Sequence, residues 1–272
     1  MTVVALTIAG SDSGGGAGIQ ADLKTFSALG VYGASVLTAL TAQNTRGVQA
    51  IHPVPASFVA RQMNSVFDDL RVAAVKIGML ADPDVIEAVA AGLERHGARS
   101  IVLDPVMVAT SGDRLIRADA VDRLRARLLP LADLLTPNLP EAAALLDEEM
   151  ATDEAAMLDQ GRRLLALGPR AVLMKGGHAS GPESADLLVT AAEWRRLAAP
   201  RRSTPNTHGT GCTLSSAAAA GLALGLPLAE ATAQAKTYLT AALAAGDELG
   251  IGGGSGPVHH FHAWWPARRT DP

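Results

Sequence analysis

The sequence predicts an α/β fold in which a mainly parallel central sheet carries helices on both faces. Across its 272 residues, short apolar runs alternate with amphipathic stretches, and glycine-rich turns follow several of the apolar runs. Strands that alternate with helices pair in parallel through crossover connections, and such sheets are covered on both faces. Neither a long linker nor a repeat interrupts the pattern. We therefore expect a single domain over residues 1–272, with residues 257–272 as its C-terminal tail.

The expected elements follow the apolar periodicity in chain order. A buried strand at 3–9 leads through a glycine-rich turn into a helix at 19–29, and a second strand follows at 34–42. Apolar residues near i, i+4 spacing predict a helix over 53–70. The next strands are expected at 73–79, 100–106, 133–136 and 170–175, with helices at 83–95, 119–129, 141–146 and 153–167. A hairpin at 185–190 and 194–198 and two helices at 210–224 and 228–249 complete the pattern.

Composition argues against several classes of protein. Hydrophobic residues make up 48% of the chain and charged residues 18%, which excludes a disordered chain. The net charge of -4 and the absence of a basic stripe argue against a nucleic-acid or membrane-surface partner. The longest apolar tract, 217–229, is broken by two glycines and a proline. It falls short of the roughly 18–20 apolar residues of a membrane span.

The single cysteine, Cys212, excludes an internal disulfide and a metal site built from several cysteines. A chain without disulfides suits a reducing compartment, so we expect a cytoplasmic protein. No basic segment precedes the first apolar run, so we expect no signal peptide.

A glycine turn ahead of an expected helix is the first candidate site. It comprises Gly209, Thr210, Gly211 and Cys212. Glycines let a phosphate approach the backbone, and the first N–H groups and the dipole of a helix favour an anion. A thiol in the first turn of a helix tends to have a lowered pKa. The alternative is an ordinary turn before a packing helix, with Cys212 as a small apolar filler.

Another glycine-rich loop, residues 10–18, joins the first strand to the first helix and is the first glycine loop in chain order. It lacks the Gly-Lys-Ser/Thr ending of a Walker A loop, and its glycines do not fit Gly-x-Gly-x-x-Gly. A dinucleotide fold is therefore disfavoured. The loop could be an anion cradle, a cover over a ligand or an ordinary flexible turn.

Two carboxylates and a lysine stand at expected strand ends. Asp104 follows one apolar strand, Glu141 follows the next within Thr-Pro-Asn-Leu-Pro-Glu, and Lys175 ends a third. Ligands of such sheets bind beyond the carboxyl ends of the strands. Carboxylates there can hold Mg²⁺ while it bridges phosphates, and a lysine can neutralise phosphate charge. Taken singly, each carboxylate could instead cap a helix or face solvent, and the lysine could be a surface residue.

The tail carries His259, His260 and His262 beside Trp264 and Trp265. These histidines could form a metal cluster, but their place in a glycine-flanked tail favours docking or packing. No Gly-x-Ser-x-Gly elbow and no triad constellation is evident, so hydrolase chemistry has no support.

Together these features favour phosphoryl transfer from a nucleotide by an α/β enzyme without a P-loop. A potential base at the glycine turn and two carboxylates suited to Mg²⁺ support an enzyme. A non-catalytic module that senses a nucleotide or another ligand is the alternative from a different class. Nucleotide consumption with small alcohols would separate the two.

The motifs closely resemble those of the hydroxymethylpyrimidine/phosphomethylpyrimidine kinase family, within the ribokinase-like superfamily. The resemblance covers nearly the whole chain, with no departure at a motif position. The matching segments are residues 5–12, 15–25, 41–45, 76–80, 102–106, 136–138, 141–142, 173–178, 206–213 and 256–265.

The resemblance implies a ribokinase-like fold and ATP- and Mg²⁺-dependent phosphorylation of 4-amino-5-hydroxymethyl-2-methylpyrimidine. A second phosphorylation would turn the monophosphate into the diphosphate for thiamine biosynthesis. The family also implies a homodimer. Pyridoxal kinase, of the same fold, is the alternative function, because a flat heteroaromatic substrate with a hydroxymethyl group and a Gly-Thr-Gly-Cys turn suit both.

The resemblance further implies roles for the residues that would surround the pyrimidine. Gln43 would contact the aminopyrimidine edge, and Asp22, Met79 and Gly10 would line the same pocket. The turn at 209–212 would form an anion hole, and its cysteine stands where most ribokinase-like sugar kinases have an aspartate as base.

The remaining implied roles concern the phosphates and the metal. Asp104 and Glu141 would organise Mg²⁺. Asn138 and Lys175 would bind the phosphates of ATP.

Overall fold

The computed structural model describes residues 1–107, 118–178 and 181–265. Its main sheet has eight strands in the order β10-β9-β8-β7-β6-β5-β1-β2. Within this sheet, the six strands β8, β7, β6, β5, β1 and β2 pair in parallel with one another, whereas β9 is antiparallel to both β8 and β10. This arrangement confirms the predicted α/β class and the predicted hairpin. The strands are β1 (Val4–Ala9), β2 (Tyr32–Leu37), β5 (Val72–Ile77), β6 (Ile101–Leu103), β7 (Leu134–Leu135), β8 (Ala171–Met174), β9 (Glu183–Thr190) and β10 (Trp194–Pro200).

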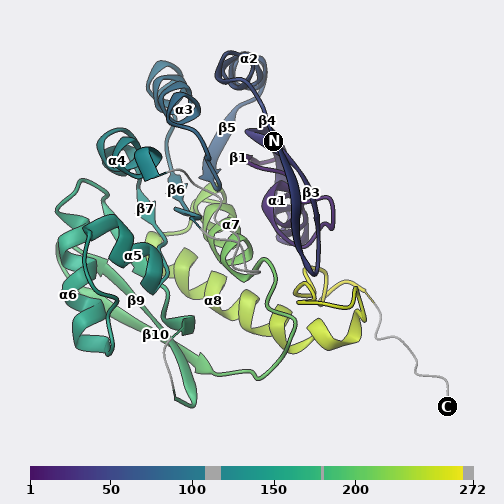
Figure 1. Cartoon of the computed structure of the whole chain (residues 1–272), viewed down its shortest axis with the longest axis vertical. Helices are drawn as coiled ribbons and strands as arrows, with labels where there is room; N and C mark the ends of the chain where they lie inside the picture. Colours follow the sequence, from purple (N-terminus) through teal and green to yellow (C-terminus); the bar gives the residue numbers. More distant parts are fainter. Residues whose placement is uncertain (108–117, 179–180, 266–272) are drawn as a thin grey trace.

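Helices cover both faces of this sheet, as predicted (Figure 1). The first group packs on one face and comprises α2 (Ala56–Phe67), α3 (Pro83–His96), α4 (Ala118–Arg127), α5 (Leu139–Leu146) and α6 (Glu154–Leu165). The second group packs on the other face and comprises α1 (Gly18–Ala28), α7 (Thr210–Ala223) and α8 (Leu228–Ala244).

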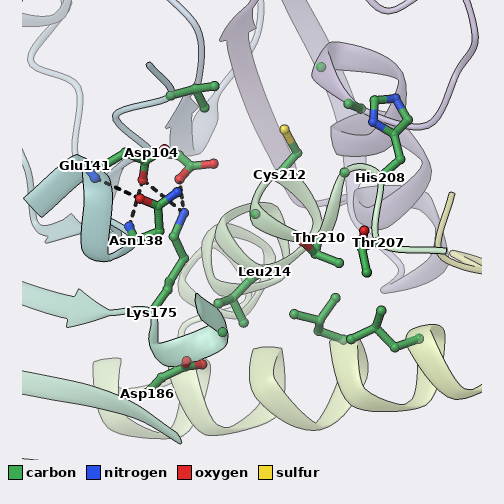
Figure 2. Close-up of a pocket in the computed structure, with 18 of the residues that line it drawn as sticks. Asp104, Asn138, Glu141, Lys175, Asp186, Thr207, His208, Thr210, Cys212 and Leu214 are labelled. Carbon is green, nitrogen blue, oxygen red and sulfur yellow. Dashed lines mark hydrogen bonds and ion pairs between the residues drawn. The ribbon is translucent and has the colours of Figure 1, made fainter. Parts of the chain in front are cut away.

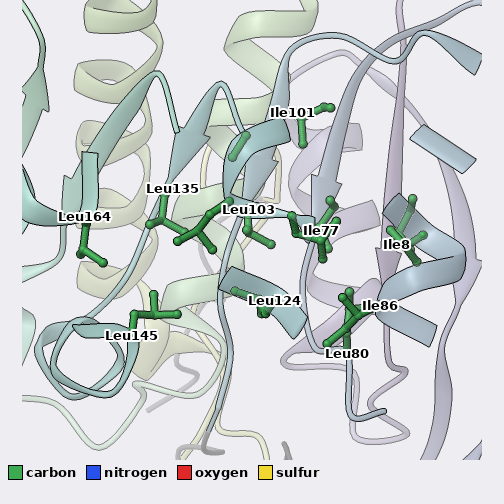
Figure 3. Packing of buried hydrophobic residues seen from close by; sticks show 14 of the residues in the cluster. Ile8, Ile77, Leu80, Ile86, Ile101, Leu103, Leu124, Leu135, Leu145 and Leu164 are labelled. Atoms are coloured by element: carbon green, nitrogen blue, oxygen red, sulfur yellow. The ribbon is translucent and has the colours of Figure 1, made fainter. Parts of the chain in front are cut away.

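The two faces have separate hydrophobic cores because alternate residues of a strand point to opposite sides of the sheet. In β6, Leu103 packs with the group from α2 to α6, whereas Val102 packs with α1, α7 and α8. Figure 3 shows the first core, where Ile8, Ile77, Leu103 and Leu135 come from four neighbouring strands and lie in a row. Because β1, β5, β6, β7 and β8 are parallel, the polar residues that follow these strands meet at one edge of the sheet.

The segment from residue 34 to 53 differs from the prediction. The apolar run predicts one strand at 34–42, but the chain leaves the main sheet after β2 and forms a separate hairpin, β3 (Ala39–Asn44) and β4 (Gly47–Pro53). Thr38 marks the break, because its N–H donates to Ala9 O at 3.0 Å and its hydroxyl donates to Met79 O at 2.9 Å. Strand β4 is mostly exposed and buries no apolar face in the core, so hydrophobic periodicity could not reveal it.

The tail docks on the helices, as its composition predicts. Trp264 Nε1 donates to Ala28 O at 2.9 Å, and Tyr238 donates from its hydroxyl to His260 O at 2.6 Å. Residues 266–272 of the predicted tail lie outside the described residues. Within the part of the chain that is described, no helix combines the length and the apolar character needed to cross a membrane.

Candidate active site

A cavity of about 680 Å³ opens at the carboxyl ends of the parallel strands. Its wall includes a residue that ends or closely follows each of β1, β5, β6, β7 and β8. These residues are Ala9, Met79, Asp104, Asn138 and Lys175. Strand β3 and the start of α7 contribute further wall residues. The cavity thus lies where an open α/β sheet binds its ligands.

The first glycine loop is ordered by a carboxylate of its own. Asp12 accepts hydrogen bonds from the N–H groups of Gly14, Gly16 and Ala17 at 2.8, 2.9 and 2.8 Å. Three N–H groups of the loop are therefore taken up inside it. This argues against an anion cradle at those positions and favours a rigid wall beside the cavity.

Helix α7 begins at the second glycine turn, beside the cavity. Gly209 has a φ of 78°, and a Cβ there would collide with the carbonyl oxygen of Gly16, so only glycine fits. The two glycine loops thus touch backbone to backbone. Thr210, Gly211 and Cys212 all line the cavity, which places the first turn of the helix at its wall. N–H groups in that position can hold a phosphoryl group.

The thiol of Cys212 does not have the lowered pKa that its place in the first turn predicts. Burial raises the pKa of Cys212 to about 11, against the charge of Lys76. The charges of Asp22 and Asp104 add to the rise. The helix start favours a thiolate, but the removal of the group from water has the larger effect. The predicted pKa shift is therefore wrong, and Cys212 is a thiol at neutral pH.

An ion-pair cluster lies directly beside the turn, and a Cβ on Gly211 would lie 3.3 Å from Lys175 Nζ. Lys175 Nζ lies 2.8 Å from Asp104 Oδ1 and 3.5 Å from Glu141 Oε2. Figure 2 shows this cluster on one side of Cys212 and His208 on the other. Burial opposes the charge of Asp104, but Lys175, Lys76 and the hydrogen bonds to the carboxylate together outweigh it and hold the pKa of Asp104 below its usual range.

Asn138 and Glu141 also form a capping box at the start of α5. Asn138 Oδ1 accepts from the N–H of Glu141 at 2.8 Å, and Glu141 Oε2 accepts from the N–H of Asn138 at 2.7 Å. Helix capping, the alternative interpretation of Glu141, is thus present together with its place on the cavity wall. Burial raises the pKa of Glu141 to about 7, the charge of Lys175 opposes that rise and the charge of Asp104 adds to it.

The donor set fits a magnesium ion that is shared with phosphates. Mg²⁺ takes oxygen ligands, keeps several waters and is commonly held by one or two carboxylates together with nucleotide phosphates. Asp104 and Glu141 supply two carboxylates on one wall, and the raised pKa of Glu141 marks a position where a further cation is favoured. No group of three potential ligands occurs among the described residues, so the phosphates would have to complete the coordination.

Three of the four residues implied for the pyrimidine lie together on the wall. These are Gln43 on β3, Met79 after β5 and Gly10 after β1. Met79 covers the loop so closely that a Cβ on residue 10 would collide with its methyl group. Gln43 Oε1 accepts from Thr41 Oγ1 at a long 3.3 Å, which leaves its amide available to a ligand.

Asp22 lies behind the wall rather than on it. Its carboxylate is fully buried and is bonded by Lys76 Nζ at 2.9 Å, Thr7 Oγ1 at 2.6 Å and Ser216 Oγ at 2.6 Å. Each carboxylate oxygen already has two partners. The expectation that Asp22 lines the pocket is therefore wrong.

The cavity has further charged wall residues that the motifs did not single out. Lys236 Nζ lies 2.8 Å from Asp186 Oδ2, and both residues line the cavity. Lys76 lines it as well, so three of the four lysines in the sequence are wall residues. The sequence holds one signal for these lysines, because lysine is scarce in a chain that has 19 arginines.

Comparison with known proteins identifies the family. The family profile described as phosphomethylpyrimidine kinase matches residues 12–259. The chain belongs to this family. It is 61% identical over 265 residues to the hydroxymethylpyrimidine/phosphomethylpyrimidine kinase of Rhizobium meliloti, covering 97% of this chain and 99% of that one. It is 59% identical over 261 residues to the protein of the same name from Escherichia coli, covering 96% and 98%.

Solved structures of two related kinases have the same fold as this chain. A phosphomethylpyrimidine kinase from Clostridium difficile superposes with a TM-score of 0.79 at 44% identity, covering 88% of this chain and 98% of that one. The pyridoxal kinase of Staphylococcus aureus in complex with AMP-PCP and pyridoxal gives a TM-score of 0.89 at 30% identity, covering 97% and 95%. The ribokinase-like fold implied by the motifs is thereby confirmed.

Proposed function

We propose that the cavity carries out two successive phosphoryl transfers from ATP. In the first, the hydroxyl oxygen of 4-amino-5-hydroxymethyl-2-methylpyrimidine attacks the γ-phosphorus, and the bond to the bridging oxygen of ADP breaks. In the second, a phosphate oxygen of the monophosphate attacks in the same way. The chain is a hydroxymethylpyrimidine/phosphomethylpyrimidine kinase of thiamine biosynthesis, because about 60% identity extends over nearly the full length of its relatives. The meeting of the glycine turn and the Asp104–Glu141–Lys175 cluster in one cavity supports this chemistry.

In this proposal the pyrimidine lies against β3 and the first glycine loop. Gln43 reads the polar edge of the ring, since an amide can donate and accept at once. Met79 supplies a soft apolar surface for the ring, and Gly10 leaves room beside it. The substrate oxygen then points toward the turn at 209–212, whose backbone N–H groups hold the phosphoryl group in transit.

The phosphates of ATP lie along that turn and the ion-pair cluster beside it. Lys175 neutralises phosphate charge, and Asn138 donates from its amide while its Oδ1 caps α5. Asp104 and Glu141 would hold Mg²⁺, which supplies positive charge to the phosphates when it is bound. Phosphoryl transfer relies on position and charge more than on proton transfer, which suits a site whose nearest base candidate is a protonated thiol.

One assay separates this function from its nearest alternative. The structural similarity to pyridoxal kinases makes pyridoxal the competing substrate. The purified protein should be given ATP and Mg²⁺ with the hydroxymethylpyrimidine, its monophosphate or pyridoxal, and ADP release should be followed. We expect both pyrimidines to be phosphorylated with a kcat/KM well above that for pyridoxal. A clear preference for pyridoxal would refute the assignment.

We further propose that the protein acts as one domain and as a homodimer in the cytoplasm. A single cavity takes wall residues from β1 through α8, which supports one domain over residues 1–272. The outer face of the β3–β4 hairpin exposes Leu40, Ala42 and Ala50, an apolar surface that a second copy could cover. Light scattering should give the mass of two chains, and Leu40→Glu should give that of one.

A reducing cytoplasm would keep the free thiol of Cys212 unmodified.

A further inference from the structure

A buried charged cluster joins four elements behind the glycine turn. It comprises Thr7 on β1, Asp22 on α1, Lys76 on β5 and Ser216 on α7. Lys76 Nζ lies 2.9 Å from both oxygens of Asp22. Ser216 Oγ donates to Asp22 Oδ1 and Thr7 Oγ1 donates to Asp22 Oδ2, each at 2.6 Å. The Lys76 and Asp22 side chains have no exposed surface. The mechanism described so far uses neither of them.

Helix geometry places this cluster next to Cys212. Ser216 follows Cys212 by four residues on α7, so the two side chains share one face of the helix. Ser216 is bonded to Asp22, and Asp22 to Lys76. Lys76 lines the cavity together with Cys212, whereas Asp22 does not line it. The ion pair therefore lies just beneath the cavity wall, with Lys76 at the wall and Asp22 behind it.

The cluster keeps Lys76 positively charged. Burial is the largest single influence and favours the neutral amine, but Asp22 and the other neighbouring groups together outweigh it and raise the pKa of Lys76 well above its usual range. The charge of Asp104 acts in the same direction. An ammonium held away from water is screened far less than a surface lysine. Because Asp22 lies behind Lys76, the ion pair contributes a net positive potential at Cys212, where the charge of Lys76 has a larger effect than that of Asp22.

We propose that Lys76 is an electrostatic positioning residue for phosphoryl transfer, oriented and kept cationic by Asp22, and that it stabilises the negative charge that gathers at the glycine turn. Lys175 acts from the cluster with the two carboxylates beside Gly211, whereas Lys76 acts from behind the turn, paired with Asp22. A charge that is already in place does not have to reorganise during the reaction. The catalytic part of this inference rests on the proposed kinase function, while the positive potential itself does not.

The single cysteine of the chain can report that potential directly. The rate at which iodoacetamide alkylates Cys212 in ligand-free protein, measured from pH 7 to 10, follows the fraction of thiolate. The charged groups that act on this thiol are Lys76 and Lys175, which favour the thiolate, and Asp22 and Asp104, which oppose it.

The test variant is Lys76→Met combined with Asp22→Asn, which removes both charges and leaves no unpaired buried ion. Because the lost cation is the nearer charge to the cavity, we expect the alkylation rate to fall at least threefold at each pH. We also expect kcat to fall about tenfold or more for both phosphorylations, with the KM for the pyrimidine within threefold. The matched control, Ser216→Ala, removes a hydrogen bond to Asp22 but no charge. It should lower thermal stability and keep the alkylation rates of the parent.

The proposal is overturned unless both the alkylation rate and kcat fall in the charge-free variant. Loss of kcat alone would indicate a packing role. If circular dichroism shows that the first variant does not fold, Lys76→Gln combined with Asp22→Asn replaces it. The two amides of this second variant can form a hydrogen bond with each other. A parent protein inactive toward both pyrimidines would refute the kinase function and with it the catalytic part of this proposal, whereas the alkylation rates, which need no substrate, would still test the positive potential.

Discussion

His208 and Asp12 stand 196 residues apart in the sequence, yet His208 Nε2 lies 2.8 Å from Asp12 Oδ2. Asp12 orders the first glycine loop, and His208 directly precedes the glycine turn of α7, so this contact joins the two loops. Burial opposes the charge of Asp12, but His208 and the loop N–H groups outweigh it and lower the pKa of Asp12. The N–H of His208 donates to Gly256 O at 3.0 Å, which ties the docked tail to the same point.

Asp12→Ala should loosen both glycine loops at once. It removes the acceptor of three loop N–H groups and of His208. A hydrogen bond to a charged group contributes about 1.5–3 kcal/mol, and the four losses do not add in full because water can reach exposed donors such as Gly14 N–H. We expect the free energy of unfolding in urea to fall by about 2–4 kcal/mol and kcat/KM to fall for both pyrimidines. Asp12→Asn keeps one oxygen and should lose less. The exposed Asp69→Ala is the matched control, and a loss no larger than its own would contradict the role of Asp12.

Gln43→Leu should impair recognition of the pyrimidine and leave the KM for ATP unchanged. The change removes the amide and leaves the polar edge of the ring unpaired, at a cost of about 1–3 kcal/mol. The KM for the pyrimidine should therefore rise about five- to 150-fold in steady-state assays. Gln49→Leu, on β4 of the same hairpin and outside the cavity wall, should change neither constant. If the KM for ATP rose equally in Gln43→Leu, the assignment of Gln43 would fail.

Asp104→Asn and Glu141→Gln should raise the Mg²⁺ concentration needed for half-maximal rate. Each removes one negative charge from the wall that faces the phosphates, which weakens the electrostatic hold on a divalent cation. The KM for the pyrimidine should change by a few-fold at most. Glu87→Gln, at an exposed ion pair with Arg127, serves as the control for the same type of substitution. An unchanged Mg²⁺ requirement in both wall variants would remove the metal role.

Glu141→Gln should also change how stability depends on pH. The folded protein raises the pKa of this carboxyl from 4.5 to about 7, so folding favours its protonated form. The stability of the parent due to this group is full below pH 4.5 and is lost as the pH rises through 7. In buffer without Mg²⁺ or ATP, the melting temperature of Glu141→Gln minus that of the parent should therefore increase from pH 5 to pH 8. A constant difference would show that Glu141 ionises in the folded protein as it does in water.

The sequence predicted the fold better than the chemistry of the site. Buried parallel strands are continuous apolar runs, so their order along the chain and the polar residues at their ends could be read directly. The break at Thr38 could not, because β2 and β3 form one apolar run and only the hydrogen bonds of Thr38 to Ala9 and Met79 separate them. Hydrophobic periodicity shows which side chains are buried, and it does not show where a buried strand ends.

The two wrong predictions at the site concern the position of Asp22 and the pKa of Cys212. Both properties depend on residues that are distant in the sequence. Asp22 follows the first glycine loop by a few residues and suits a pocket wall, but Lys76, 54 positions away, binds it behind the wall. Cys212 starts a helix, which alone would lower its pKa, yet the surrounding protein buries it and raises that pKa. Partners across the sheet decide both outcomes, and a local motif does not contain them.

The Cys212 variants test whether a thiol takes part in proton transfer. Cys212→Ser keeps the size and polarity but ionises less readily, and Cys212→Ala removes the group. If Cys212 accepts the proton of the substrate hydroxyl, kcat should fall by about 10²–10⁴ in both variants, with the KM for the pyrimidine within a few-fold. Cys212→Asp, the residue of the sugar-kinase branch, should keep more activity than the alanine variant.

The raised pKa of Cys212 adds a signature that a packing role cannot produce. Since the pKa is about 11, the thiolate fraction grows roughly tenfold per pH unit between pH 7 and 10. If the thiolate is the base, kcat of the parent should rise over that range and the rise should vanish in Cys212→Ala. ATP brings negative charge that opposes ionisation, and Lys76 and Lys175 favour it. If Cys212→Ala kept nearly full kcat for both phosphorylations, the backbone N–H groups of the turn would be sufficient and the base would be solvent or the phosphate itself.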